Sequence, residues 1–296
     1  MFMRWMKDSR LWMIVSMATF GTLAPFVRAI AVSSGELALY RAILACGIIG
    51  LFLILTRQKI ALGGIAKDLL LLLFSGMAMG INWILLFEAY KYTTVSVATL
   101  SYYFAPVIVT LVCPFLFREK LTGKQFLCFV MSTAGLVLIT ATAGGGVATN
   151  HLKGVLFGLG AAVLYAGVVL VNKFIKGVGG LQRTLFQFIA AIVTLLPYVL
   201  LTGGFHLEML DTAGWGSLLI VGIFHTGITY CLYFSSLKEL PGQKAAILSY
   251  IDPLMAVFIS VLVLKEDMNI WQAIGGLLIL GFTLFNEISI GKKKPL

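Results

Sequence analysis

Residues 96–120 read SVATLSYYFAPVIVTLVCPFLFREK, an apolar run of membrane-spanning length with a proline near its middle and charges at its end. A related run, AAILSYIDPLMAVFISVLVLKED, occupies residues 245–267. At an offset of 147, Pro106 falls on Pro253 and Glu119 falls on Glu266. A proline that interrupts a membrane-length segment at matching places in both halves indicates a substrate site where two repeats meet. We therefore predict helix breaks at Pro106 and Pro253.

The composition places the chain in a membrane. Of its 296 residues, 60% are hydrophobic and 11% are charged, with a mean hydropathy of +1.00. Soluble domains are roughly half apolar. Apolar runs of about 20 residues are long enough to cross a bilayer core of about 30 Å, and such runs must be helical because lipid offers the backbone no partners. The sequence predicts an all-α polytopic membrane protein.

We expect ten transmembrane helices in two halves, residues 1–146 and 147–296, which are joined by the Gly- and Thr-rich segment 140–150. Because five is an odd number, the second half would enter the membrane in the opposite orientation, which gives two inverted repeats. Residues 80–125 and 227–272 share ten identities in 46 positions at the offset of 147. The predicted spans are 11–31, 37–56, 69–90, 95–117, 126–143, 155–174, 185–202, 215–237, 245–264 and 270–290.

Loop charges predict the orientation. With the N-terminus inside, 17 of the 22 Lys and Arg residues fall in cytoplasmic segments, and only Arg28, Lys91, Lys153 and Lys265 fall in outer ones. Such a bias indicates cytoplasmic N- and C-termini in the inner membrane, so the net charge of +10 needs no nucleic-acid partner. The four cysteines lie inside apolar spans without metal-ligand or redox spacing, and we expect neither a metal nor a cofactor.

The chain resembles the EamA-type branch of the drug/metabolite transporter superfamily. The resemblance is carried by LFEAYKYTTVSVATL (86–100), APV (105–107), FREKLTGKQ (117–125) and their echo in the second half, with Arg41 near the start of the second span. It implies an inverted-repeat basket whose cavity is lined by the first, third, fourth, sixth, eighth and ninth helices. Members are typically secondary transporters, often proton-driven exporters, of varied small metabolites.

Two ionisable residues inside spans are candidates for proton coupling. Placing such groups in lipid costs free energy, so their presence there indicates a function. Asp252 is the deepest carboxylate; it could accept a proton, balance a cationic substrate or cap the half-helix that begins at Pro253. His225 lies near the centre of the eighth span, on a polar stripe that continues to Tyr233, and could pair with Asp252. The alternative for His225 is a neutral side chain bonded to a neighbouring helix.

Glu88 is the third candidate charge. It is predicted at the depth of Arg41 and Arg28, so a structural ion pair between Arg41 and Glu88 competes with a gate or substrate role for Glu88.

Polar and aromatic residues of the predicted cavity helices are candidates to line a substrate site. Together with a carboxylate, the aromatic rings could hold an amine or a quaternary ammonium group, although each ring could equally be ordinary packing. The candidates are Asn82, Trp83, Thr99, Tyr102, Tyr103, Tyr165, Thr229, Tyr230, Ser249 and Tyr250.

The predicted function is transport. The sequence holds no nucleophile elbow, HExxH or phosphate-binding glycine loop, so we expect neither an enzyme nor catalytic residues. The leading hypothesis is alternating-access, proton-coupled export of a small polar metabolite, an amino acid or an amine. Two alternatives are a facilitator or importer of an organic cation such as choline, and a membrane subunit or lipid-carrier flippase component without transport activity of its own. The expected partners are the small-molecule substrate and the lipid bilayer, and no oligomeric state is predicted.

Overall fold

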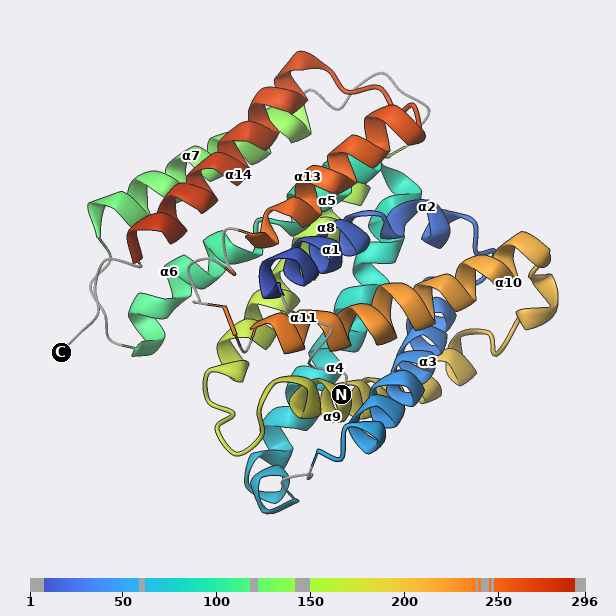
Figure 1. The fold of residues 1–296 in the computed structure, drawn as a ribbon. Helices are drawn as coiled ribbons and strands as arrows, with labels where there is room; N and C mark the ends of the chain where they lie inside the picture. Colours follow the sequence, from blue (N-terminus) through green and yellow to red (C-terminus); the bar gives the residue numbers. More distant parts are fainter. Residues whose placement is uncertain are drawn as a thin grey trace.

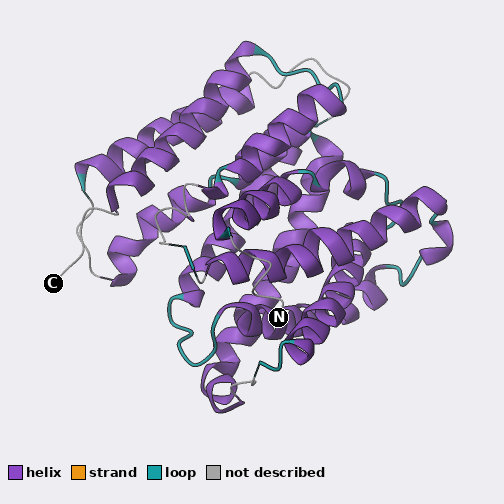
Figure 2. Ribbon diagram, viewed as in Figure 1, coloured by secondary structure: helices purple, strands orange, loops and turns teal. Residues whose placement is uncertain are grey.

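The structure is a computed structural model that describes residues 8–58, 62–117, 122–141, 150–237, 239–240, 245 and 248–290. Within these residues every regular element is a helix and no strand occurs (Figure 2). The all-α expectation is therefore confirmed. The helices are α1 (Ser9–Gly21), α2 (Leu23–Arg28), α3 (Ser34–Leu55), α4 (Leu62–Tyr92), α5 (Val95–Tyr102), α6 (Ala105–Phe117), α7 (Gly123–Ala141), α8 (His151–Asn172), α9 (Gly180–Thr202), η2 (Leu207–Met209), α10 (Thr212–Leu219), η3 (Ile220–Ile228), α11 (Thr229–Leu237), α13 (Ile251–Phe258), η4 (Ile259–Val263) and α14 (Ile270–Ile290).

Seven segments of the described chain are long and apolar enough to cross a membrane. They are Ser9–Arg28, Ser34–Leu55, Ile65–Tyr92, Val95–Cys113, His151–Asn172, Gly180–Thr202 and Thr212–Leu237. Three further apolar helices, Gly123–Ile139, Ile251–Val263 and Ile270–Asn286, are shorter.

Side-chain caps start several of these helices at the residues where the chain turns. Asp211 accepts the Gly214 N–H at 2.7 Å at the start of α10. Ser33 and Glu36 form a reciprocal capping box at the start of α3. Each cap satisfies backbone donors that have no partner in the first turn, which fixes where the helix begins.

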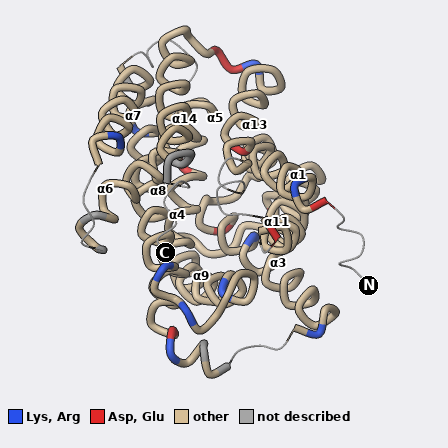
Figure 3. The backbone as a smooth tube through the Cα atoms, turned by 60° about the vertical axis from the view of Figure 1, so that its left-hand side comes forward, with Lys and Arg blue, Asp and Glu red and all other residues tan. Residues whose placement is uncertain are grey.

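The surface of the bundle exposes large apolar side chains, and its largely apolar interior also buries polar and charged groups. Leu201, Phe115 and Leu70 are 80% or more exposed, whereas Gln187, Asn82 and Arg41 are buried. The charged residues are few and gather mostly near helix ends (Figure 3). This distribution suits a chain surrounded by lipid.

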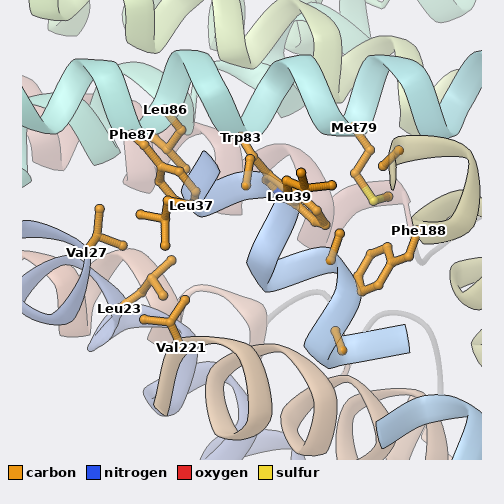
Figure 4. Packing of buried hydrophobic residues seen from close by; sticks show 14 of the residues in the cluster. Leu23, Val27, Leu37, Leu39, Met79, Trp83, Leu86, Phe87, Phe188 and Val221 are labelled. Carbon is orange, nitrogen blue, oxygen red and sulfur yellow. The ribbon is translucent and has the colours of Figure 1, made fainter. Parts of the chain in front are cut away.

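Helix α4 is the central packing partner, in contact with α8 and α9 along much of its length. Its face toward α3 and α9 carries Trp83 and Phe87, which join Leu37 and Phe188 in the largest buried cluster (Figure 4).

Helices α7 and α14 form a separate pair along one side (Figure 1). They touch backbone to backbone, because a Cβ on Gly135 would lie 2.5 Å from the Gly275 carbonyl oxygen.

Several of the membrane-length helices are interrupted. The first span breaks at Thr22, between α1 and α2, and the fourth breaks at Tyr103 and Phe104, between α5 and α6. Helix α13 begins at Ile251, two residues before Pro253, and follows a turn at Tyr250. In each case a proline lies in the first turn of the second piece, where its missing N–H costs no helical bond. The eighth span instead carries a π-helix, η3.

Candidate functional site

The helix breaks of the fourth and ninth spans meet at one hydrogen bond. The Tyr103 hydroxyl, at the end of α5, donates to the Asp252 carboxylate at 2.5 Å. Asp252 is the second residue of α13, and Tyr250 occupies the N-cap position without a side-chain hydrogen bond. The expectation that Asp252 caps this half-helix is therefore wrong. Its carboxylate instead faces the break in α5–α6, on the other half of the chain.

Further tyrosines lie in the neighbourhood of this carboxylate. The Tyr102 ring lies 5.9 Å from Tyr103 and 5.4 Å from Tyr165 on α8, centroid to centroid. Tyr90 and Tyr230 also lie within electrostatic range of Asp252. Helices α4, α5, α8, α11 and α13 thus each contribute a residue to one polar, aromatic zone.

The break in the first span packs against the same place. A Cβ on Gly21 would lie 2.4 Å from the Asp252 carbonyl oxygen, so only glycine lets α1 approach the first turn of α13 this closely. The next residue, Thr22, contacts the His225 ring, with 3.0 Å between Thr22 Oγ1 and His225 Nε2. The first-span break therefore connects to both the eighth and the ninth spans.

His225 and Asp252 do not form the predicted pair. His225 is buried in η3, with its two ring nitrogens near Thr22 Oγ1 and the Ile220 carbonyl oxygen. Its ring also packs against the Phe26 ring, with 5.0 Å between the two ring centroids. A π-helix adds one residue to the turn, and such turns often mark functional sites.

Arg41 is buried within the bundle and lies over aromatic rings. Its Nε donates to Thr226 Oγ1 at 2.7 Å, and its Cζ lies 4.6 Å above the centroid of the Trp83 ring and 5.6 Å from that of Phe87. The aromatic chain continues from Trp83 through Phe188 to Tyr230, with centroid separations of 5.0 and 5.3 Å.

The predicted ion pair between Arg41 and Glu88 is wrong. Glu88 pairs with Lys91 one turn along its own helix, at 2.8 Å. Arg41 lies instead on the face of α3 that packs against η3. A shared depth in the membrane does not determine the direction in which each helix points its side chain, so two charges at one depth need not meet.

The remaining predicted lining residues make local or packing contacts. Asn82 is buried and donates to the Ala161 carbonyl oxygen at 2.6 Å, which joins α4 to α8. Thr229 and Ser249 bond to carbonyl oxygens of their own helical segments, Phe224 and Ala245. Thr99 is buried on α5, and Tyr250 is half-buried in the turn before α13.

A charged network closes one end of the bundle. Arg28, at the end of α2, forms an ion pair with Glu266 at 2.5 Å and donates to the carbonyl oxygens of Tyr90 and Thr93. Glu266 also accepts the Val95 N–H at 2.8 Å and the Ser260 hydroxyl proton. The network ties both halves of the chain together. We call it the Arg28–Glu266 latch.

A small cavity of about 110 Å³ lies beside the latch. Its walls include Arg28, Leu37, Phe87 and Tyr90. The buried Phe87 ring lines this cavity and also lies beside the Arg41 guanidinium.

Sequence reasoning missed Arg41 as an isolated buried cation, the latch and the break at Thr22. Pro25 was a usable signal for the break, since it stands in the first turn of α2 as Pro253 does in α13. In the described part of the chain, no group of three or more His, Cys, Asp or Glu residues could hold a metal ion.

Similarity to known proteins identifies the family of this chain. The model of the EamA-like transporter family matches residues 9–141 and again residues 152–286. The chain belongs to the EamA-like transporter family. The predicted resemblance is thereby confirmed, and with it the expectation of a membrane transporter and not an enzyme.

Proteins with similar sequences are also named as transporters. The uncharacterized transporter YxxF of Bacillus subtilis (strain 168) is 28% identical over 264 residues, 89% of this chain and 84% of that protein. An uncharacterized transporter of Clostridium kluyveri is 26% identical and covers 74% of this chain and 72% of its own length. One solved crystal structure aligns with a TM-score of 0.65 over 97% of this chain and 99% of its own, at 19% identity, and shows likeness of fold.

Proposed function

We propose that this member of the family is a proton-coupled secondary transporter that exports a small polar metabolite, an amino acid or an amine, by alternating access. The Tyr103–Asp252 hydrogen bond carries the proposal. An ionisable group at a helix break is expensive in a membrane and is retained where it binds a substrate or a proton. Asp252 can do either.

In this proposal the chain has ten transmembrane helices in two inverted five-helix repeats, residues 1–146 and 147–296. Seven long and three shorter apolar segments support the number ten. The separate family matches to residues 9–141 and 152–286 support the division into two repeats. The matching breaks before Pro106 and Pro253 support their correspondence.

The charge bias favours cytoplasmic termini in the inner membrane, which places the Arg28–Glu266 latch on the outer side. The latch and the buried Phe87 ring then close the outer side. Alternating access requires the latch to open once in each cycle.

Asp252 and His225 are the two titrating candidates, and the hydrogen-bond geometry favours Asp252. Asp252 faces tyrosines from several helices, whereas His225 is bonded to Thr22 and to its own helix. We therefore assign the coupled proton to Asp252 and a positioning role at the first-span break to His225.

The test uses the purified full chain in proteoliposomes, with a panel of radiolabelled amino acids and amines. Asp252→Asn is expected to abolish uptake driven by a pH gradient, while Glu208→Gln, an exposed carboxylate far along the chain on η2, leaves it unchanged. Unchanged uptake and unchanged pH dependence in Asp252→Asn would refute the coupling role. Failure of the wild-type protein to move any compound of the panel would favour a membrane subunit without transport activity.

A further inference from the structure

Arg41 is a buried cation with few partners. Arg41 is 4% exposed, and its one hydrogen bond to a described residue runs from Nε to Thr226 Oγ1. A guanidinium has five N–H donors. The two Nη groups donate to no residue in the part of the chain that the structure describes.

The neighbouring carboxylates are engaged elsewhere. Glu36, on the same helix, accepts the His206 N–H at 2.6 Å and caps α3. Glu88 pairs with Lys91, and Asp252 accepts from Tyr103. A buried charge without a counter-charge is costly, so an anion supplied by a ligand would satisfy Arg41 where the described protein does not.

The aromatic rings orient the guanidinium. The guanidinium lies over the Trp83 ring, with Arg41 Cζ 4.6 Å from the ring centroid. A guanidinium stacked on a ring keeps its N–H edge available, and that edge binds a carboxylate with two parallel hydrogen bonds. The same stacking opposes a quaternary ammonium ligand, since Arg41 already occupies the face of Trp83.

Arg41 and Asp252 belong to one region. Tyr90, Tyr102 and Tyr230 lie within electrostatic range of Arg41, and the same three tyrosines lie within electrostatic range of Asp252. A cation and a carboxylate thus belong to one zone, in which three tyrosines interact with both. Such a zone suits a substrate that carries both signs of charge.

We propose that Arg41 binds the carboxylate of the transported substrate, which makes the substrate an amino acid and excludes simple amines and organic cations. This inference rests on the proposed transport function. The ammonium group of the substrate would lie toward Asp252. Arg41 is then the residue that determines specificity, and Asp252 remains the coupling residue.

Thermal melting of the detergent-solubilised full chain tests this inference. The probes are the common L-amino acids, and each one that raises the melting temperature is compared with its methyl ester and its decarboxylated amine. We expect both derivatives to bind roughly 10- to 100-fold more weakly than the acid, since they lose charge-assisted hydrogen bonds. Arg41→Gln should lose the preference for the acid. Arg183→Gln, which removes a guanidinium bonded to the Asn172 carbonyl oxygen, should keep it.

Arg41→Lys is the control for a folding defect, since it keeps the positive charge. It should melt near the wild-type temperature and bind the acid about tenfold more weakly, because an ammonium lacks the guanidinium fork. Equal binding of acid and ester by the wild type, or undiminished acid binding by Arg41→Gln or Arg41→Lys, would overturn the inference. The inference would also be overturned if no carboxylate-bearing compound raised the melting temperature. Counterflow of amines in proteoliposomes would then still support the transport proposal, so the two failures are distinguishable.

Discussion

Glu266→Gln should open the end of the bundle that the latch closes, which is the outer end in the proposed orientation. Glu266 holds Arg28 at 2.5 Å and accepts the Val95 N–H at 2.8 Å. The substitution removes the negative charge but leaves a carbonyl oxygen that can still accept from Val95. It therefore weakens the ion pair between Arg28 and Glu266 and can keep the hydrogen bond to the first turn of α5.

The size of the effect follows from burial. The side chains of Arg28 and Glu266 are 32% and 12% exposed, so solvent screens the pair only in part. Hydrogen bonds to charged groups contribute about 1.5–3 kcal/mol, and we take about 2 kcal/mol for this pair. That value raises the ratio of open to closed protein about 30-fold, since each 1.4 kcal/mol is a factor of ten.

Cysteine labelling measures this ratio. Leu37 lines the cavity beside the latch and is 2% exposed, so a Leu37→Cys variant without the four native cysteines reports opening. A membrane-impermeant maleimide is applied to right-side-out vesicles. Labelling should accelerate about 30-fold in the Glu266→Gln background, because the rate follows the open population when opening and closing are fast.

Glu88→Gln provides the matched control. It breaks the Glu88–Lys91 pair, whose side chains are 24% and 49% exposed. Exposed pairs contribute about 0–1 kcal/mol, so labelling should rise less than about fivefold. Equal labelling with and without Glu266→Gln, or an equal increase in Glu88→Gln, would refute the latch. Labelling from the inner side alone would refute its assignment to the outer side.

Three further substitutions test the packing around the site. Gly21→Val should lower the melting temperature and abolish transport, because its Cβ would lie 2.4 Å from the Asp252 carbonyl oxygen. Gly47→Val should do neither, since no atom lies within 4 Å of the added Cβ. Equal effects of the two substitutions would contradict the close approach of α1 to α13. Gln187→Leu should destabilise the protein by about 1–3 kcal/mol, because it removes two hydrogen bonds, one to the buried Ser75 hydroxyl and one to the half-buried Asn172 side chain, and unfolding that is unchanged in denaturant would speak against it. His225→Gln should retain pH-driven uptake at a reduced rate, and complete loss of the pH dependence would transfer the coupling role to His225.

The fold class could be predicted because lipid imposes strong constraints on composition. Apolar runs of about 20 residues have few alternatives to a helix in a membrane, and every regular element among the residues that the structure describes is a helix. The prolines were equally informative. Pro106 and Pro253 both stand in the first turn after a break, because a proline there sacrifices no helical hydrogen bond.

The contacts of individual charges could not be predicted in the same way. Glu88 had a local partner, Lys91, at the i,i+3 spacing that favours ion pairs on a helix, and this signal outweighs a match in membrane depth. Arg41 turns toward Thr226, which lies 185 residues away in a π-helix that shifts the register of the polar stripe. Arg28 and Glu266 are 238 residues apart. Pairings of this kind depend on helix rotation and packing, which hydropathy does not encode.

Proton flux through Asp252 tests the central claim most directly. Proteoliposomes that contain the full chain and an internal pH-sensitive dye receive a mixture of L-amino acids on one side. Wild-type protein should produce a pH change inside the vesicles that scales with amino-acid uptake, and Glu208→Gln should match it. Asp252→Asn should exchange amino acids without any pH change. A pH change of wild-type size in Asp252→Asn would contradict the account.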